Sequence, residues 1–224
     1  SYVLWVAGSG ASEIVGTYSA SKYTTNGVED AGGSLSGTPD SSGGSLSIST
    51  TYTYAVALYK PSTGVTGNVA LDEEVTMGGA DTEVDLDLSS VTNSDSTKYT
   101  QIWVYRSAAG GQTGFTTGDL IAKLSAGTTS YNDQGSSIAS SVNIPRAGNT
   151  VLDNSQLPSG TYKHLTKFKQ RLVTVAESTV YISDLNKSES WPTVNRINVP
   201  SGGEITGIGV ISFNTPTTSE LDEI

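Results

Sequence analysis

The amino-acid sequence predicts an all-β protein, and three of its features carry that prediction. Glycine is frequent, with 25 among 224 residues, and the hydrophobic and charged shares of 35% and 15% are both low. Several short runs alternate apolar and polar side chains, which is the period of a strand with one buried face. Helical periodicity is nearly absent, and residues 152–157 and 220–224 are its only faint candidates. The expected architecture is a β-sandwich followed by a smaller sheet, with long loops rich in Gly and Ser.

Residues 1–45 are expected to form an N-terminal strand and a loop-rich arm. Apolar runs at 2–7 and 13–18 predict strands, and the remainder is dominated by Gly, Ser and Thr. So little apolar surface does not offset the conformational entropy that the chain loses on folding. We therefore expect these two strands to pair with another sheet, with long loops between them.

Residues 46–138 predict the sandwich, because strand-like runs recur there with turn residues between them. These runs lie at 51–59, 82–88, 99–106, 119–124 and 128–133. In the run at 82–88, Glu83, Asp85 and Asp87 alternate with apolar residues and are expected to face solvent. The predicted core comprises Tyr52, Tyr54, Val56, Leu58, Val84, Leu86, Ile102 and Val104.

A linker at 139–160 is expected to lead to a second module at 161–213, followed by a polar, acidic arm at 214–224. Apolar runs at 171–176, 179–183 and 205–213 predict three strands of this module. The two residues between the first and second of these runs are few enough to require a hairpin. Trp191 precedes Pro192 in a polar loop, and we expect it to fold back over the sheet.

The second module resembles a known family. The segments KQRL (169–172), VYISD (180–184), ESWP (189–192), NV (198–199) and GEITG (203–207) follow one another in this order. This order resembles one blade of the β-propeller-like modules of bacteriophage tail and other virion proteins. A lone blade cannot bury both of its faces. The resemblance therefore implies either a longer protein or other chains that complete the sheet.

The first module is similar to the fibronectin type III-like (Ig-like) domains that phage virion proteins carry. The matching elements are residues 52–59, 102–107 and 128–133. Because such domains also occur in adhesins and glycosidases, this similarity implies a fold more than a role. The two resemblances in one chain together imply a virion protein of the phage tail or of the head–tail junction.

The net charge of −10 is opposite to what binding to nucleic-acid phosphates requires. No apolar run reaches the ~20 residues that a membrane helix needs, so neither nucleic acid nor membrane is an expected partner. The local basic cluster consists of Lys163, His164, Lys167, Lys169 and Arg171. On one continuous strand, residues 167, 169 and 171 share a face, which is either solvated or meets an acidic neighbour.

The residue types that enzymes use are scarce in this chain. It has no Cys and a single His, which rules out a disulfide or a thiolate metal site. The carboxylates at 72–74 and 83–87 lie on expected solvent faces, and no loop has the ligand spacing of a Ca²⁺ site. We therefore expect no catalytic residue, no metal and no cofactor.

Two functions remain open from the sequence. One is a non-enzymatic virion structural protein that assembles with copies of itself and with other virion proteins. The other is an extracellular adhesin or carbohydrate-binding module that recognises a host-surface glycan. Trp5, Trp103 and Trp191 distinguish them, because sugar-stacking rings are exposed side by side and packing rings are buried.

The strands at 171–183 carry apolar side chains on both faces, and the chain supplies no second blade to cover them. A closed, ring-like oligomer would cover them with neighbouring subunits. The residues that we expect at such an interface are Trp191, Trp5, Lys167, Lys169 and Arg171.

Overall fold

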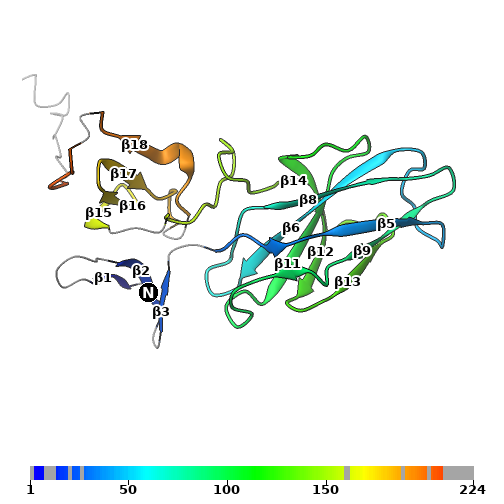
Figure 1. Cartoon of the computed structure of the whole chain (residues 1–224), viewed down its shortest axis with the longest axis horizontal. Helices are drawn as coiled ribbons and strands as arrows, with labels where there is room; N and C mark the ends of the chain where they lie inside the picture. The colour runs from blue at the N-terminus through cyan, green and yellow to red at the C-terminus, as the bar shows by residue number, and fades with distance from the viewer. Residues whose placement is uncertain are drawn as a thin grey trace, which may run out of the picture.

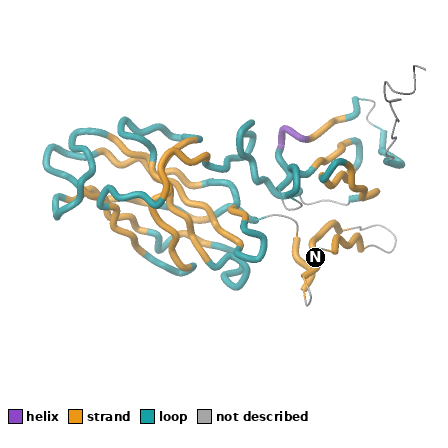
Figure 2. The backbone as a smooth tube through the Cα atoms, turned by 180° about the vertical axis from the view of Figure 1, so that it is seen from behind, coloured by secondary structure: helices purple, strands orange, loops and turns teal. Residues whose placement is uncertain are grey.

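The computed structural model describes residues 3–7, 14–19, 22–25, 28–158, 162–187, 190–200 and 203–208, with only the backbone before residue 28. These residues form an all-β structure without an α-helix (Figures 1 and 2). The expected all-β fold class is therefore confirmed. The faint helix expected at 152–157 is wrong, because that segment is irregular. The candidate at 220–224 lies outside the described residues.

The N-terminal strands form a small antiparallel sheet of their own. Its order is β1 (Val3–Ala7), β2 (Ile14–Ser19) and β3 (Lys22–Thr25). Both expected strands are present. They pair with each other, and β2 also pairs with β3, so among the described residues they join no other sheet; pairing of the outer edge of β1 with another sheet stays a prediction.

Two facing sheets make the sandwich. The larger has the order β14–β12–β11–β6–β7, with β8 also paired to β6, and the smaller has the order β13–β9–β5. The strands of the larger sheet are β6 (Thr51–Lys60), β7 (Val65–Thr66), β8 (Leu71–Thr76), β11 (Gln101–Arg106), β12 (Thr117–Ser125) and β14 (Ala139–Asn143). Those of the smaller sheet are β5 (Ser36–Asp40), β9 (Glu83–Asp87) and β13 (Ser130–Asp133). A short ribbon of β4 (Gly32–Gly33) and β10 (Val91–Thr92) lies outside both.

The sandwich is wider than the predicted range of 46–138. Strand β5 comes from the expected arm and β14 from the expected linker, and each is an edge strand of its sheet. Pro39 lies within β5, which fits an edge position because proline donates no hydrogen bond to a neighbouring strand.

The predicted core is confirmed. All eight residues belong to one buried cluster between the two sheets, and each is at most 6% exposed. A second cluster covers the opposite face of the larger sheet, where Val69, Phe115 and Ile144 from loops pack on Ala55 and Ala57 of β6. The larger sheet is therefore buried on both faces.

Glu83 is a correction to the predicted register. Asp85 and Asp87 face solvent as expected, but Glu83 is only 4% exposed. The loop after β5 covers it, because the Leu46 N–H donates to the Thr82 carbonyl at 2.9 Å. Gln134 Nε2 donates to the buried Glu83 carboxylate at 3.3 Å.

We expect Leu86→Ala to destabilise the sandwich by about 2–5 kcal/mol, because Leu86 is fully buried in the core cluster. Asp85→Ala on the neighbouring, exposed position should cost less than about 0.5 kcal/mol. Denaturant unfolding of both variants measures the difference. Equal costs would mean that the register of β9 is displaced by one residue.

One ion pair lies inside the sandwich. Arg106 Nη1 donates to both carboxylate oxygens of Asp133 at 2.8 Å, and the Tyr54 hydroxyl donates to the same carboxylate at 2.9 Å. Asp133 is fully buried and Arg106 is 6% exposed. Burial acts to lower the pKa of Arg106, but the charge of Asp133 and the hydrogen bonds to it raise that pKa, so Arg106 keeps its charge. It joins β11 to the end of β13.

The C-terminal unit is a small, curled sheet of four antiparallel strands in chain order (Figure 1). They are β15 (Lys163–Phe168), β16 (Arg171–Ala176), β17 (Thr179–Ile182) and β18 (Arg196–Asn198), and the 3₁₀ helix η1 (Thr193–Asn195) precedes the last. The expected strands at 171–176 and 179–183 and the two-residue turn between them are confirmed. The strand expected at 205–213 is absent over 203–208, and the rest of that range lies outside the described residues.

Candidate functional site

The sandwich and the C-terminal unit are joined through the carboxylate of Asp153, which is 3% exposed. Its Oδ1 accepts hydrogen bonds from Asn68 Nδ2 at 3.1 Å and from the Ser155 amide at 2.8 Å. Its Oδ2 accepts from the Gly148 amide at 2.8 Å and from both the amide and the hydroxyl of Thr193 at 2.9 Å. One carboxylate therefore holds the sandwich, the linker and the C-terminal unit together.

Further bonds from the same residues extend this contact. The Asn154 amide donates to Asn68 Oδ1 at 2.8 Å, and Asn154 Nδ2 donates to the Thr66 carbonyl at 3.0 Å. Ser190, which is completely buried, donates its hydroxyl to the Asp153 carbonyl at 2.9 Å. We call the set of Asn68, Asp153, Asn154, Ser155, Ser190 and Thr193 the junction clasp.

The charge of Asp153 is stabilised by its donors. Burial alone raises the pKa of this carboxyl, but the hydrogen bonds from Ser155, Thr193 and Gly148 outweigh burial and lower the pKa to about 2. Asp30, whose carboxylate accepts the Asn68 amide at 2.9 Å, shows the opposite shift. Burial raises the pKa of Asp30, and the nearby charges of Asp153 and Glu29 add to the rise.

The clasp should weaken in acid. The folded-state pKa of Asp153 is about 2, below the usual value for an unfolded aspartate of about 3.9, so its contribution is complete above about pH 4 and is lost as the pH falls towards 2. Asp30 acts in the opposite sense, because a raised folded-state pKa favours folding at low pH.

We expect Asp153→Asn to reduce the protection of residues 190–200 from hydrogen exchange at neutral pH. The further loss of protection as the pH falls should be smaller in the variant than in the wild type, because the variant has no carboxylate to protonate. Hydrogen exchange at several pH values measures both effects. An unchanged acid profile in the variant would contradict this role of Asp153.

Trp191 lies directly beside the clasp. Its amide donates to the Ser155 carbonyl at 2.8 Å, and its side chain is 1% exposed. The expectation that this ring folds back into the protein is confirmed. The indole Nε1 has no hydrogen-bond acceptor among the described residues. Because its ring is buried inside the chain, Trp191 offers no surface to another subunit in this conformation, and an assembly role for it stays a prediction.

Trp103 packs against neighbouring side chains. Its ring stacks on Tyr59 at a centroid distance of 4.6 Å, and Lys123 Nζ lies 4.2 Å from the centroid of the Trp103 ring. The rings of Trp103 and Trp191 are thus not side by side on an open face. Trp5 lies in β1, a strand for which the structure describes only the backbone.

The basic cluster does not form the continuous stripe that the sequence predicted. Lys169 and Gln170 form the turn between β15 and β16, and Phe168 pairs with Arg171 across it. Lys167 therefore lies on one strand, Lys169 in the turn and Arg171 on the next strand. The error arose because Lys-Gln is not a typical turn sequence.

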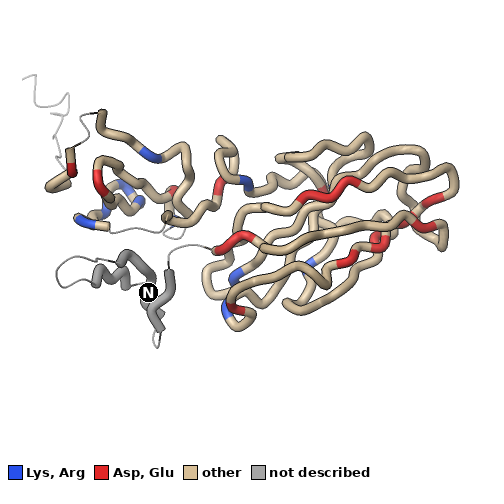
Figure 3. Tube along the Cα trace, viewed as in Figure 1, with Lys and Arg blue, Asp and Glu red and all other residues tan. Residues whose placement is uncertain are grey.

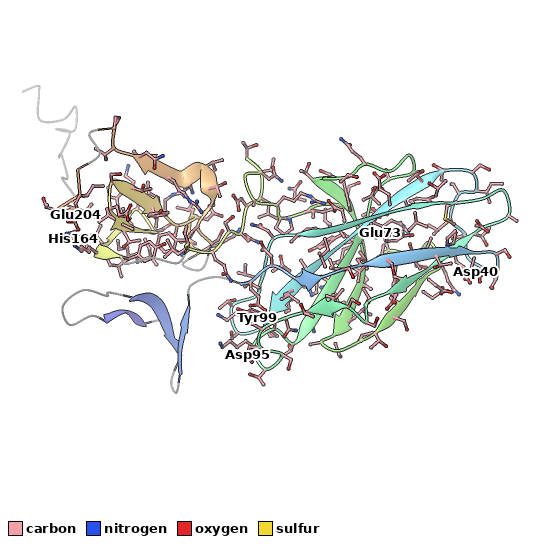
Figure 4. All side chains as sticks on the ribbon, viewed as in Figure 1. Asp40, Glu73, Asp95, Tyr99, His164 and Glu204 are labelled. Carbon is pink, nitrogen blue, oxygen red and sulfur yellow. The ribbon has the colours of Figure 1, made fainter. Side chains whose placement is uncertain are left out.

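Three other basic residues of this unit, Lys163, Arg171 and Lys187, pair with nearby carboxylates. Lys163 binds Glu204, and Arg171 lies 3.8 Å from Asp184, which also binds Lys187 at 3.3 Å. His164 has a φ of 55° at an irregularity of β15 and lies at the outer end of the unit near Glu204 (Figure 4).

The described ranges, 3–7, 14–19, 22–25, 28–158, 162–187, 190–200 and 203–208, offer neither a metal site nor a membrane-spanning helix. No group of three or more His, Cys, Asp or Glu side chains in these ranges is arranged to hold a metal ion. None of their helices has the length and hydropathy needed to cross a bilayer.

The junction clasp was not predicted, although its residues carry a local signal. Asp153, Asn154 and Ser155 are consecutive, and their side chains are those that readily bond backbone amides. Their partners Asn68 and Thr193 lie 85 and 40 residues away, and no periodicity connects them.

The sequence matches no protein-family model, and no curated protein is significantly similar to it.

Proposed function

We propose that this chain is a non-enzymatic structural subunit of a virion, in the phage tail or at the head–tail junction, that works by assembling with copies of itself and with other virion proteins. The virion context rests on the resemblance of residues 169–207 to a propeller-like blade and of the sandwich to phage Ig-like domains. Direct binding to nucleic acid or to membranes is not part of this function.

The observation that carries the assembly role is the uncovered apolar surface of the C-terminal unit. Four of its large apolar side chains, Phe168, Leu185, Val194 and Ile197, are between 42% and 54% exposed. Both hydrophobic clusters found in the described residues belong to the sandwich, and neither includes a residue of β15–β18. Four of the seven large apolar side chains that are exposed in the described residues thus belong to this small unit, and apolar side chains that gather on one surface mark interaction sites.

The buried and stacked tryptophans favour this role over the glycan-binding alternative. A sugar platform requires an open aromatic face. Trp191 is buried, and Trp103 lies in contact with Tyr59 and Lys123. Their arrangement is that of packing residues.

Cryo-electron microscopy of the native particle that contains the chain tests the proposal. The expected result is density for the sandwich and the four-stranded sheet, repeated around the tail axis or the head–tail axis. A particle without this density, together with a purified chain that stays monomeric, would overturn it.

A further inference from the structure

The turn between β15 and β16 and the two residues before it, residues 167–170, form an exposed tip, although the Gln170 carbonyl accepts the Asn186 amide at 3.0 Å. Lys169 and Gln170 have φ values of 44° and 63°, a left-handed conformation that non-glycine residues adopt at an energetic cost. Phe168 is 42% exposed, and Lys169 Nζ lies 5.4 Å from the centroid of its ring. Positive φ at both central residues is what the favoured two-residue hairpin turns require, so the backbone at Lys169 and Gln170 is set by the hairpin.

The side chains of this tip have no other use within the described residues. Phe168 belongs to neither hydrophobic cluster. Lys167 and Lys169 form no ion pair with a described carboxylate, in contrast to Lys163, Arg171 and Lys187 of the same unit. An exposed aromatic ring between two unpaired cations is a suitable anchor for an acidic protein surface.

The sandwich of the same chain carries such an acidic surface. Residues 28–158 hold 14 acidic and five basic side chains, of which 11 acidic and three basic ones are not buried, whereas residues 162–208 hold four acidic and six basic ones (Figure 3). On the outer face of β9, Asp85 and Asp87 are exposed, and the strands β5, β9 and β13 contain no Lys or Arg. Small polar residues lie opposite them, Thr38 across from Asp85 and Ser130 across from Asp87. Asp85 accepts a hydrogen bond from Asn132 Nδ2 and Asp87 from the Ser89 amide, and neither forms an ion pair with a described residue.

We propose that the tip at 167–170 of one copy docks on the Asp85–Asp87 face of a second copy. This inference rests on the proposed assembly function and names the partner of the C-terminal unit. Asp85 and Asp87 lie about 7 Å apart, as alternate residues of a strand do, and Lys167 and Lys169 likewise flank one residue. Because the two surfaces differ, the contact is head-to-tail, and such contacts close into rings or continue as filaments.

Complementation between two charge-reversal variants tests the contact by sedimentation velocity. The tip variant is Lys167→Glu with Lys169→Glu, and the face variant is Asp85→Lys with Asp87→Lys. We expect the wild-type chain to self-associate and each variant alone to associate at least tenfold more weakly. An equimolar mixture should form a dimer, because one intact contact remains between a wild-type tip and a wild-type face. Lys98→Glu with Lys123→Glu is the matched control, with the same change in net charge elsewhere on the sandwich. It gives up the Lys98–Asp95 ion pair and the Lys123–Trp103 contact, both within the sandwich, and should associate like the wild type.

Three outcomes would overturn the inference. A tip variant that associates as strongly as the wild type shows that the hairpin is not the anchor, while the assembly function stands. Two monomeric variants whose mixture also stays monomeric show that the two surfaces do not bind each other. A wild-type chain that remains monomeric at every concentration removes both this inference and self-assembly. Circular dichroism of each variant confirms that the fold is retained.

Discussion

Asp133→Ala is expected to destabilise the sandwich by about 3–5 kcal/mol. The carboxylate is fully buried and accepts from Arg106, from the Tyr54 hydroxyl and from the Gly135 amide at 2.8–2.9 Å. Its removal leaves the guanidinium of Arg106 charged inside the protein with only its weaker partners, Asp119 and the Gly135 carbonyl, both at 3.3 Å. Denaturant unfolding at neutral pH measures the free energy of unfolding of this variant.

Asp119→Ala is the matched control, because it removes the other carboxylate that Arg106 contacts. The side chain of Asp119 is 30% exposed, so its loss should cost no more than about 1 kcal/mol. Replacing Arg106 and Asp133 together by apolar residues should recover part of the stability, since no unpaired charge then remains buried. If Asp133→Ala and Asp119→Ala lower the free energy of unfolding equally, burial of the Arg106–Asp133 pair does not determine how much the pair contributes to stability.

Four strands of the sandwich, β6, β9, β11 and β12, were predictable because their sequences are rich in apolar residues that alternate with others. This period is present in the structure at Val84, Leu86 and Ile102. Strands β5 and β14 were missed for the converse reason. Their sequences, SGTPD and ASSVN, hold few apolar residues. They are strands because a neighbouring strand is present to pair with them, which a local pattern does not report.

The polar sites were less predictable than the core. Glu83, Asp133 and Asp153 are buried by segments that are distant in sequence, and a single acidic residue in a strand or linker is more often exposed. Even so, aspartate is a residue type whose side chain readily bonds backbone amides, and the Asp153 carboxylate accepts the amides of Gly148, Ser155 and Thr193 in the junction clasp. The interface role expected for Trp5, Trp191, Lys167, Lys169 and Arg171 stays a prediction. In the structure Trp191 is buried, and Lys167 and Lys169 lie on the β15–β16 tip.

Trp191→Ala is expected to unfold the C-terminal unit while the sandwich remains folded. Truncation of a buried aromatic ring costs about 3–5 kcal/mol, and this small sheet has no hydrophobic cluster of its own among the described residues to offset such a loss. The sandwich keeps both of its clusters, neither of which includes Trp191. Hydrogen exchange should therefore rise in residues 162–200 and stay unchanged in residues 51–143.

Trp191→Phe separates the loss of packing from the loss of the indole N–H. The buried Nε1 has no acceptor among the described residues, so removing it gives up no hydrogen bond there and relieves a buried, unpaired donor. The phenylalanine variant should thus retain most of the protection of residues 162–200 that the alanine variant loses. If both substitutions unfold the unit to the same extent, ring packing is not the whole contribution of Trp191, and the indole N–H stabilises the unit through a hydrogen bond. If neither does, Trp191 does not hold the C-terminal unit against the linker, and the junction clasp alone sustains it.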